Sequence, residues 1–275
     1  MISNPKIFVV QMEIIPNNPE ANFIKIKSFF SQAKHNNCDF ILFPEYCDGI
    51  IYPEFFNKEH PKKFIKTMQI LSRESNIYCI AGSILEKANS KFYNSSYVIS
   101  RKGEVIGKYR KKKLHPRDEK HLEIGKNELI FNTEFGKIGV LICRDMVYPE
   151  LTKSLKDQGV KIIFCPTFWN YFGFDYEMDT SNIKTNYPVD TDIKVLKILP
   201  QARAIENELF FIISNAAGQY YLGGHKEELA GHSSINSPLH GSIQSLNHYD
   251  EGIIIATLNL NYIEDSKNTF KLSDD

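Results

Sequence analysis

The chain has 275 residues and a mass of 31.7 kDa, and its 33 basic residues balance 33 acidic ones. This balance argues against a general binder of nucleic acid or anionic membranes, because such proteins usually carry a basic surplus. No apolar stretch approaches the roughly 20 residues needed to cross a bilayer, and the N-terminus lacks the pattern of a signal peptide. The five cysteines have no spacing that suggests a disulfide framework, so we expect a cytoplasmic protein.

Short apolar runs alternate with segments of helical period along the whole chain. Asn18 is the expected N-cap of the first helix, and Pro19 suits its first position. Strands this apolar predict sheets covered on both faces, and the alternation without repeat or linker predicts one α/β domain over residues 1–275. In chain order the pattern predicts strand 7–10, helix 19–34, strand 40–43, helix 61–73, strands 77–84, 98–100 and 139–143, a helix from Pro149 to before Gly159, strand 161–165, helix 192–207, and strands 209–214 and 253–258.

Two segments depart from this alternation. Residues 108–113, KYRKKK, hold five basic side chains in six, and residues 170–192 form a long segment dense in aromatic and acidic side chains. A loop of that length inside a compact domain is usually functional or disordered. The basic run is typical of a solvated edge, and the zero net charge disfavours a nucleic-acid site there.

Cys143 differs from the other cysteines because it ends an apolar strand and precedes the helix predicted at Pro149. A thiol near a helix N-terminus gains thiolate character from backbone N–H groups and the helix dipole. The alternative is a buried core cysteine, which is our interpretation of the other four. Glu45 also follows an apolar strand, at the rim where α/β sheets bind ligands, although a lone acid there is often only an ion-pair partner.

Several further motifs accompany these two residues. They are FPE at 43–45, NSS at 94–96, YRK at 109–111, Gly125, FGKIGVLIC at 135–143, Asp145 with YPE at 148–150, RAIENELFFIISNAAG at 203–218 and GHSSI at 231–235. Their identity and order resemble the nitrilase (carbon–nitrogen hydrolase) superfamily over nearly the whole chain. The resemblance implies a four-layered α-β-β-α sandwich and a homodimer or larger even-numbered assembly.

The resemblance also implies site residues. Carried over by position, Glu45 is the general base, Lys111 the oxyanion-stabilising lysine, Glu119 the second glutamate and Cys143 the nucleophile. A cysteine thiol is mostly protonated at neutral pH, so it needs a base or positive neighbours to react. The ammonium of Lys111 and the backbone N–H of Arg144 would hold the oxyanion formed by attack on a carbonyl. This chemistry requires no metal and no cofactor.

The implied reaction is hydrolysis of a small amide or an N-carbamoyl amine through a cysteine thioester, with release of ammonia. A true nitrilase and a catalytically silent binding protein are the alternatives, and the filled catalytic positions disfavour the second. Candidate substrate contacts are Arg144, Thr167, Phe168 and Trp169. Arg144 would favour a substrate carboxylate or pair with Glu150, whereas the aromatic and acidic residues of 168–192 would favour a cationic amine or form a surface flap.

Competing sites have weaker signatures. Ser233 and Ser234 lack the glycine two residues later that a nucleophile elbow needs, and the histidines form no zinc motif. A protease-like pair of Cys143 with His115 or His121 is a further alternative. The chain departs from the superfamily pattern at position 113, where lysine replaces the usual histidine.

Overall fold

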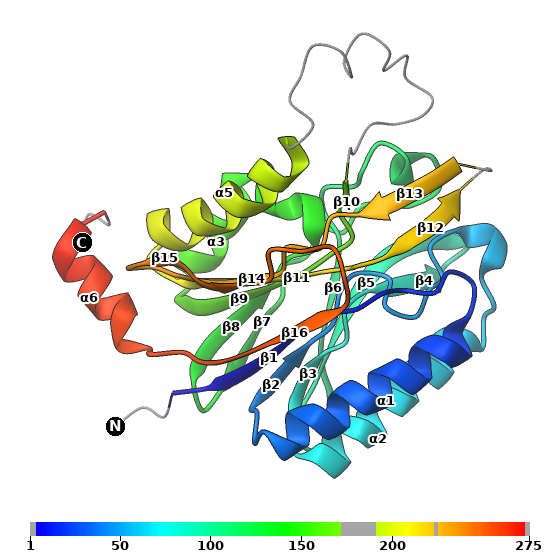
Figure 1. The fold of residues 1–275 in the computed structure, drawn as a ribbon, viewed down its shortest axis with the longest axis horizontal. Coiled ribbons are helices and arrows are strands. Elements are labelled where there is room, and N and C mark those ends of the chain that lie inside the picture. The colour runs from blue at the N-terminus through cyan, green and yellow to red at the C-terminus, as the bar shows by residue number, and fades with distance from the viewer. Residues whose placement is uncertain (1–3, 172–190, 223–224, 273–275) are drawn as a thin grey trace, which may run out of the picture.

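The computed structural model describes residues 4–171, 191–222 and 225–272. Two large β-sheets lie face to face, and helices cover the outer side of each, so the layers run α-β-β-α (Figure 1). This arrangement is the predicted four-layered sandwich. Among the described helices, none is long and apolar enough to cross a membrane.

The first sheet has seven strands in the order β16-β1-β2-β3-β5-β4, with β6 paired to β5. Helices α1 (Pro19–His35) and α2 (His60–Ser75) cover its outer face. The Asn18 side chain caps α1 by accepting the Ala21 N–H at 3.1 Å, as predicted. The strands are β1 (Lys6–Gln11), β2 (Phe40–Leu42), β3 (Tyr78–Ile80), β4 (Ile84–Ala88), β5 (Lys91–Ile99), β6 (Val105–Arg110) and β16 (Gly252–Thr257).

The second sheet has six strands in the order β15-β14-β11-β9-β8-β7. Helices α3 (Pro149–Asp157) and α5 (Thr191–Glu206) cover it, and α6 (Asn261–Phe270) follows the last strand of the first sheet. Its strands are β7 (Ile130–Thr133), β8 (Gly136–Val140), β9 (Val160–Thr167), β11 (Phe210–Asn215), β14 (Ser234–Ser237) and β15 (Gly241–Ser245).

A small third sheet and three short 3₁₀ helices complete the described elements. The small sheet has the order β10-β13-β12 and comprises β10 (Asn170–Tyr171), β12 (Gln219–Leu222) and β13 (His225–Leu229). The 3₁₀ helices are η1 (Pro53–Phe55), η2 (Asp118–Lys120) and η3 (Cys143–Val147).

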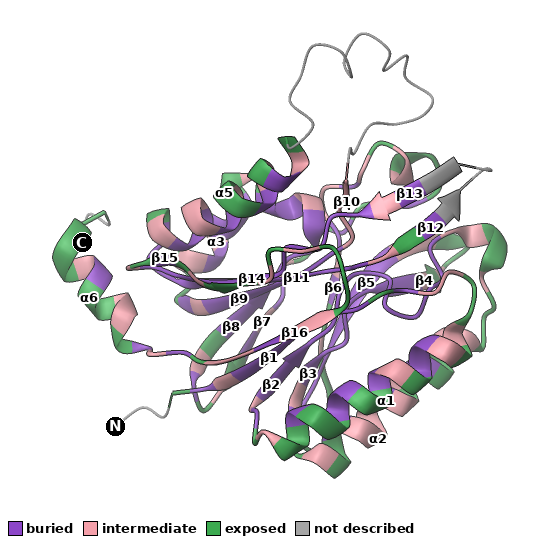
Figure 2. Cartoon of the chain, viewed as in Figure 1, coloured by how far each residue is buried: buried purple, intermediate pink, exposed green. Residues whose placement is uncertain are grey.

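Apolar side chains fill the space between the two large sheets and the space beneath α1 and α2. Phe40 and Leu42 of the first sheet share one buried cluster with Phe164 and Ile212 of the second. The central strands are buried on both faces, whereas the helices bury one stripe each (Figure 2). The near-continuous apolar runs of the sequence follow from this double burial.

Most predicted elements are confirmed with small shifts of their ends, but three strands differ more. The predicted strand 98–100 is only the end of β5, which begins at Lys91. The run 77–84 divides into β3 and β4 because Gly82 adopts a φ of 47°, where a Cβ would lie 2.1 Å from the Pro44 carbonyl oxygen. The predicted strand 139–143 ends as β8 at Val140, and Cys143 belongs to η3. The nucleophile candidate therefore lies on a turn rather than in a strand.

Candidate active site

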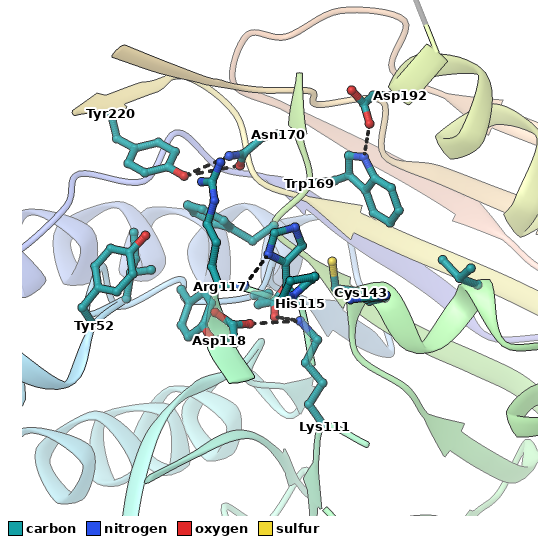
Figure 3. Close-up of a pocket in the computed structure, with 17 residues that line it drawn as sticks. Tyr52, Lys111, His115, Arg117, Asp118, Cys143, Trp169, Asn170, Asp192 and Tyr220 are labelled. Carbon is teal, nitrogen blue, oxygen red and sulfur yellow. Dashed lines mark hydrogen bonds and ion pairs between the residues drawn. The ribbon is translucent and has the colours of Figure 1, made fainter. Parts of the chain in front are cut away.

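A pocket of about 380 Å³ lies where the loops that follow several strands meet the small sheet (Figure 3). Glu45 comes shortly after β2, Lys111 directly after β6, Cys143 after β8 and Phe168 directly after β9. Because β2 and β9 each pair in parallel with a neighbouring strand, the carboxyl ends of parallel strands gather at this rim. Residues from distant parts of the chain therefore face one cavity.

Cys143 occupies the first position of η3 with a φ of 48°, a left-handed conformation that few non-glycine residues adopt. Its side chain is buried. Burial and the charge of Glu45 raise the pKa of the Cys143 thiol well above its ordinary value, while Lys111 and a hydrogen bond from the Phe168 backbone act in the opposite direction. The resting thiol is therefore neutral at pH 7 and needs a base to become a nucleophile.

Lys111 and Glu45 form a buried ion pair beside this thiol. Lys111 Nζ lies 2.7 Å from Glu45 Oε1, and the two side chains are 2% and 1% exposed. Burial alone would lower the pKa of Lys111, but the negative charges of Glu45 and Asp118 oppose this effect and the pKa is raised. The lysine is therefore a permanent cation in the site.

Asn94 holds both members of this pair. Its Nδ2 donates to Glu45 Oε1 at 2.6 Å, and its backbone carbonyl accepts the Lys111 N–H at 2.9 Å. The second carboxylate oxygen, Glu45 Oε2, is buried without a hydrogen-bond partner among the described residues. That oxygen is consequently available to accept a proton from a reacting group.

Asp118, and not Glu119, is the acid that lies beside Lys111 in the pocket. Asp118 lines the pocket and its Oδ2 lies 3.8 Å from Lys111 Nζ, whereas Glu119 is exposed and lies outside the pocket lining. Both residues belong to η2, and successive side chains of a 3₁₀ helix point about 120° apart, so only one of the two can face Lys111. Burial raises the pKa of Asp118, and the charge of Lys111 partly offsets that rise.

Comparison with known proteins identifies the family of this chain. The family model described as carbon-nitrogen hydrolase matches residues 6–268. The chain belongs to the carbon–nitrogen hydrolase family. It is 25% identical to the 2-oxoglutaramate amidase of Bacillus subtilis, over 98% of this chain and 96% of that protein.

Solved structures of this family share the fold. Nit3 of Saccharomyces cerevisiae, a member of branch 10 of the nitrilase superfamily, superposes with a TM-score of 0.81 at 22% identity, covering 99% of this chain and 96% of that one. A mutant of the amidase from Nesterenkonia sp. AN1 superposes with a TM-score of 0.79 at 19% identity, covering 98% and 96%. The α-β-β-α sandwich is thus the fold of this family.

The four candidate substrate contacts differ in position. Arg144, Phe168 and Trp169 line the pocket, but Thr167 does not. Thr167 is fully buried at the end of β9, where its carbonyl accepts the backbone N–H of Glu45 at 3.3 Å. Thr167 therefore joins the two sheets beneath the site instead of lining it.

Arg144 is the cation of the pocket without an acidic partner among the described residues. Its Nη1 donates to the Leu114 carbonyl at 2.9 Å, and Glu150 pairs with Lys113 at 3.5 Å instead. Arg117, by contrast, lies 3.4 Å from Glu227 of the small sheet. The side chain of Arg144 is therefore free to meet an anionic group in the pocket.

The basic run 108–113 is neutralised by specific acids. Lys108 and Arg110 share Glu86 at 2.6 and 2.8 Å, and Lys112 lies 3.6 Å from Glu128. With Lys111 and Lys113 paired as described above, each basic side chain of the run has an acidic partner. The run does not form the free basic surface that nucleic acid would need.

The histidine alternatives occupy two different positions. His115 lines the pocket, where its Nδ1 accepts the Arg117 N–H at 3.3 Å, while His121 is exposed outside it. The charges of Glu45 and Lys111 have the largest electrostatic effects on the pKa of the Cys143 thiol. Among the described residues, no group of three His, Cys, Asp or Glu side chains is arranged to hold a metal ion.

Sequence patterns gave no indication of the wall that the small sheet contributes. Asn170 of β10 donates to Glu227 of β13 at 2.7 Å and to the hydroxyl of Tyr220 of β12 at 3.1 Å. Figure 3 shows Tyr220, Asn170 and Arg117 together on one side of the cavity. Arg117 and Asn170 lie close to site motifs in the sequence, but Tyr220 and Glu227 reach them only through the pairing of β10, β12 and β13, which no local pattern predicts.

Proposed function

We propose that the protein hydrolyses a small primary amide, releasing ammonia, with Cys143 as the nucleophile. The observation that supports this most is the convergence of Cys143, Glu45 and Lys111 in one pocket, with Glu45 Oε2 unpartnered. Asp118 takes the part of the second acid that the sequence assigned to Glu119. The 275 residues would act as one carbon–nitrogen hydrolase domain.

The first half of the reaction forms a thioester. Glu45 Oε2 removes the thiol proton of Cys143 as the sulfur attacks the amide carbonyl, which turns the carbonyl oxygen into an oxyanion. The Lys111 ammonium and the Arg144 backbone N–H hold that charge, and each such donor typically contributes about 10²–10³ in rate. Glu45 then returns the proton to the nitrogen, the C–N bond breaks and ammonia leaves.

The second half hydrolyses the thioester. Water gives a proton to Glu45 as its oxygen attacks the thioester carbonyl, and the same donors hold the second oxyanion. Collapse breaks the C–S bond and the proton returns to the Cys143 sulfur, leaving a carboxylic acid. Asp118 keeps Lys111 charged and oriented through both halves.

Two comparisons support amide chemistry. A relative that spans nearly the whole chain is a 2-oxoglutaramate amidase, and the Nesterenkonia amidase mutant carries the acetamide moiety of fluoroacetamide at its active-site cysteine. N-carbamoyl amines and nitriles are the other substrates that this chemistry admits. A panel of all three classes separates them.

We also propose that the amide carries a carboxylate, which Arg144 would bind. The unpaired guanidinium in the pocket supports this, because a planar fork of N–H donors matches a carboxylate. The alternative is a cationic amine bound by the acidic side chains of the segment 168–192. Of these acids, Asp192 already accepts the Trp169 Nε1–H at 2.9 Å, and most of the others lie in 172–190, outside the described residues.

Arg144→Ala should raise KM about tenfold or more for glutaramate and leave KM for butyramide nearly unchanged. Equal effects on both substrates would refute this role of Arg144.

The test of the proposed function is ammonia release from primary amides, N-carbamoyl amines and nitriles, with wild type and Cys143→Ala side by side. Release from amides that is lost in the variant supports the proposal. Silence of the folded wild type across the panel would favour the catalytically silent binding protein instead.

Location and assembly belong to the same proposal. The five cysteines are buried and free, which suits a reducing cytoplasm. We expect a small-molecule substrate, no nucleic-acid or membrane partner, and a homodimer or larger assembly. Light scattering of the purified protein measures the assembly directly.

A further inference from the structure

The carboxylate of Asp145 lies between the nucleophile turn and the segment that carries Lys111. It is fully buried at the third position of η3, two residues after Cys143. Its Oδ2 accepts the hydroxyl of Tyr109 at 2.7 Å and the N–H of Ile142 at 2.9 Å, and its Oδ1 accepts the N–H of Lys113 at 2.8 Å. All three donors come from residues that flank the catalytic side chains.

Two of these donors belong to residues on either side of Lys111, and the third belongs to the residue before Cys143. Tyr109 precedes Lys111 by two residues and Lys113 follows it by two, so the carboxylate binds a side-chain hydroxyl before the lysine and a backbone N–H after it. Ile142 directly precedes Cys143, and the Asp145 N–H in turn donates to the Ile142 carbonyl at 3.0 Å. This reciprocal pair closes the turn in which Cys143 adopts its left-handed conformation.

We propose that Asp145 is a positioning residue that fixes the Lys111 ammonium relative to the Cys143 sulfur, and that it does so only as a carboxylate. Three donors point at two oxygens that carry no proton. A proton on Oδ2 would compete with the two donors that this oxygen accepts and would weaken one of these hydrogen bonds. The assignment rests on the proposed function for its kinetic test, but not for its chemical one.

The surroundings of Asp145 make its protonation measurable. Burial raises its pKa to about 6, and the hydrogen bond from Tyr109 and the charge of Lys111 limit that rise. The titratable groups that face it are Tyr109 and Lys111 on the β6 side and Cys165 on β9. The thiol of Cys165 is neutral near pH 6 because burial raises its pKa, so it does not titrate in this range.

The first experiment compares Asp145→Asn with Glu208→Gln. Glu208 is an equally buried acid that pairs with Lys156 at 2.7 Å and lies outside the pocket. The same isosteric change at Glu208 therefore measures the effect of losing a buried negative charge away from the site. Since misplacement of reacting groups by about 1 Å costs about 10²-fold, we expect kcat for the best amide of the panel to fall about tenfold or more in Asp145→Asn, with KM and Tm little changed. A loss of kcat below threefold, or an equal loss in Glu208→Gln, would overturn the proposal.

The second experiment needs no substrate. Iodoacetamide alkylates a thiolate with loss of iodide, and peptide mapping reports the rate at Cys143 alone. The pKa of the Cys143 thiol lies well above this range, so its thiolate fraction alone lowers the rate about tenfold for each pH unit of acidification. After correction for that slope, we expect a further fall on the acid side of a midpoint near pH 6. In Tyr109→Phe, which removes one donor to the carboxylate, this midpoint should move upward by about one pH unit.

The two arms separate failure of the positioning role from failure of the proposed function. His115 and Asp118 also titrate in the pocket, but neither is bonded to Tyr109, so an unmoved midpoint in Tyr109→Phe would refute the role of Asp145. A moved midpoint in a protein that hydrolyses none of the panel would support the role of Asp145 and overturn the proposed function alone.

Discussion

Replacing Lys111 by methionine removes the positive charge beside Glu45 and leaves the side-chain volume nearly constant. The ammonium lies 2.7 Å from Glu45 and 3.8 Å from Asp118, and its charge also lowers the pKa of the Cys143 thiol. The variant therefore loses one oxyanion donor, worth about 10²–10³ in rate. It also raises the pKa of both Cys143 and Asp118, so the expected fall in kcat/KM is about 10²-fold at least.

The same substitution has a cost in stability. The buried carboxylate of Glu45 and the partly buried carboxylate of Asp118 lose their cation, and breaking a buried pair from one side costs about 3–5 kcal/mol. The assay is ammonia release at a temperature where circular dichroism shows both proteins folded. Lys112→Met is the matched control, because Lys112 lies one residue away, pairs with Glu128 at 3.6 Å and does not line the pocket. Activity of Lys111→Met within tenfold of wild type, or an equal loss in Lys112→Met, would refute the reasoning.

Three further predictions concern the site and its support. Cys143→Ala should abolish turnover and leave the unfolding temperature nearly unchanged, and residual wild-type rate would exclude Cys143 as the nucleophile. Asp118→Asn should lower kcat about tenfold or more while Glu119→Gln stays within about twofold, and the reverse order would restore Glu119 as the second acid. Burial alone would raise the pKa of Glu86, but Arg110 and its other donors hold it at about 2. Glu86→Gln should therefore lower the free energy of unfolding by about 1–2 kcal/mol at pH 7, after solvent screening, and urea titrations should show this loss shrinking as pH falls from about 4.5 toward 2.

The fold could be predicted from the sequence because its central strands are buried on both faces. Phe40–Leu42 and Val160–Thr167 read as continuous apolar runs for that reason. Strand β6 could not be predicted because its sequence, VIGKYR, leads into a basic run. In the fold, Glu86 of β4 compensates the positive charges of Lys108 and Arg110. That pairing depends on the sheet and cannot be seen in the local pattern.

The candidate site also contains residues that the sequence predicts and residues that only the fold reveals. Glu45 and Cys143 are candidates because each follows a recognisable apolar run, and Lys111 is a candidate because it belongs to the YRK motif. The choice between Asp118 and Glu119 depends on the direction of one turn of η2, which sequence does not determine. The wall formed by Arg117 and Glu227 joins residues 110 positions apart, so only the assembled fold brings them together.

The central claim is that an acyl group is carried on the sulfur of Cys143 during hydrolysis. Mixing the enzyme with its best amide, quenching in acid within milliseconds and weighing the intact protein tests this most directly. The account predicts a mass increase equal to the acyl group, mapped to the peptide that contains Cys143 and lost in Cys143→Ala. Turnover with the acyl group on another residue, or turnover that persists in Cys143→Ala, would contradict it.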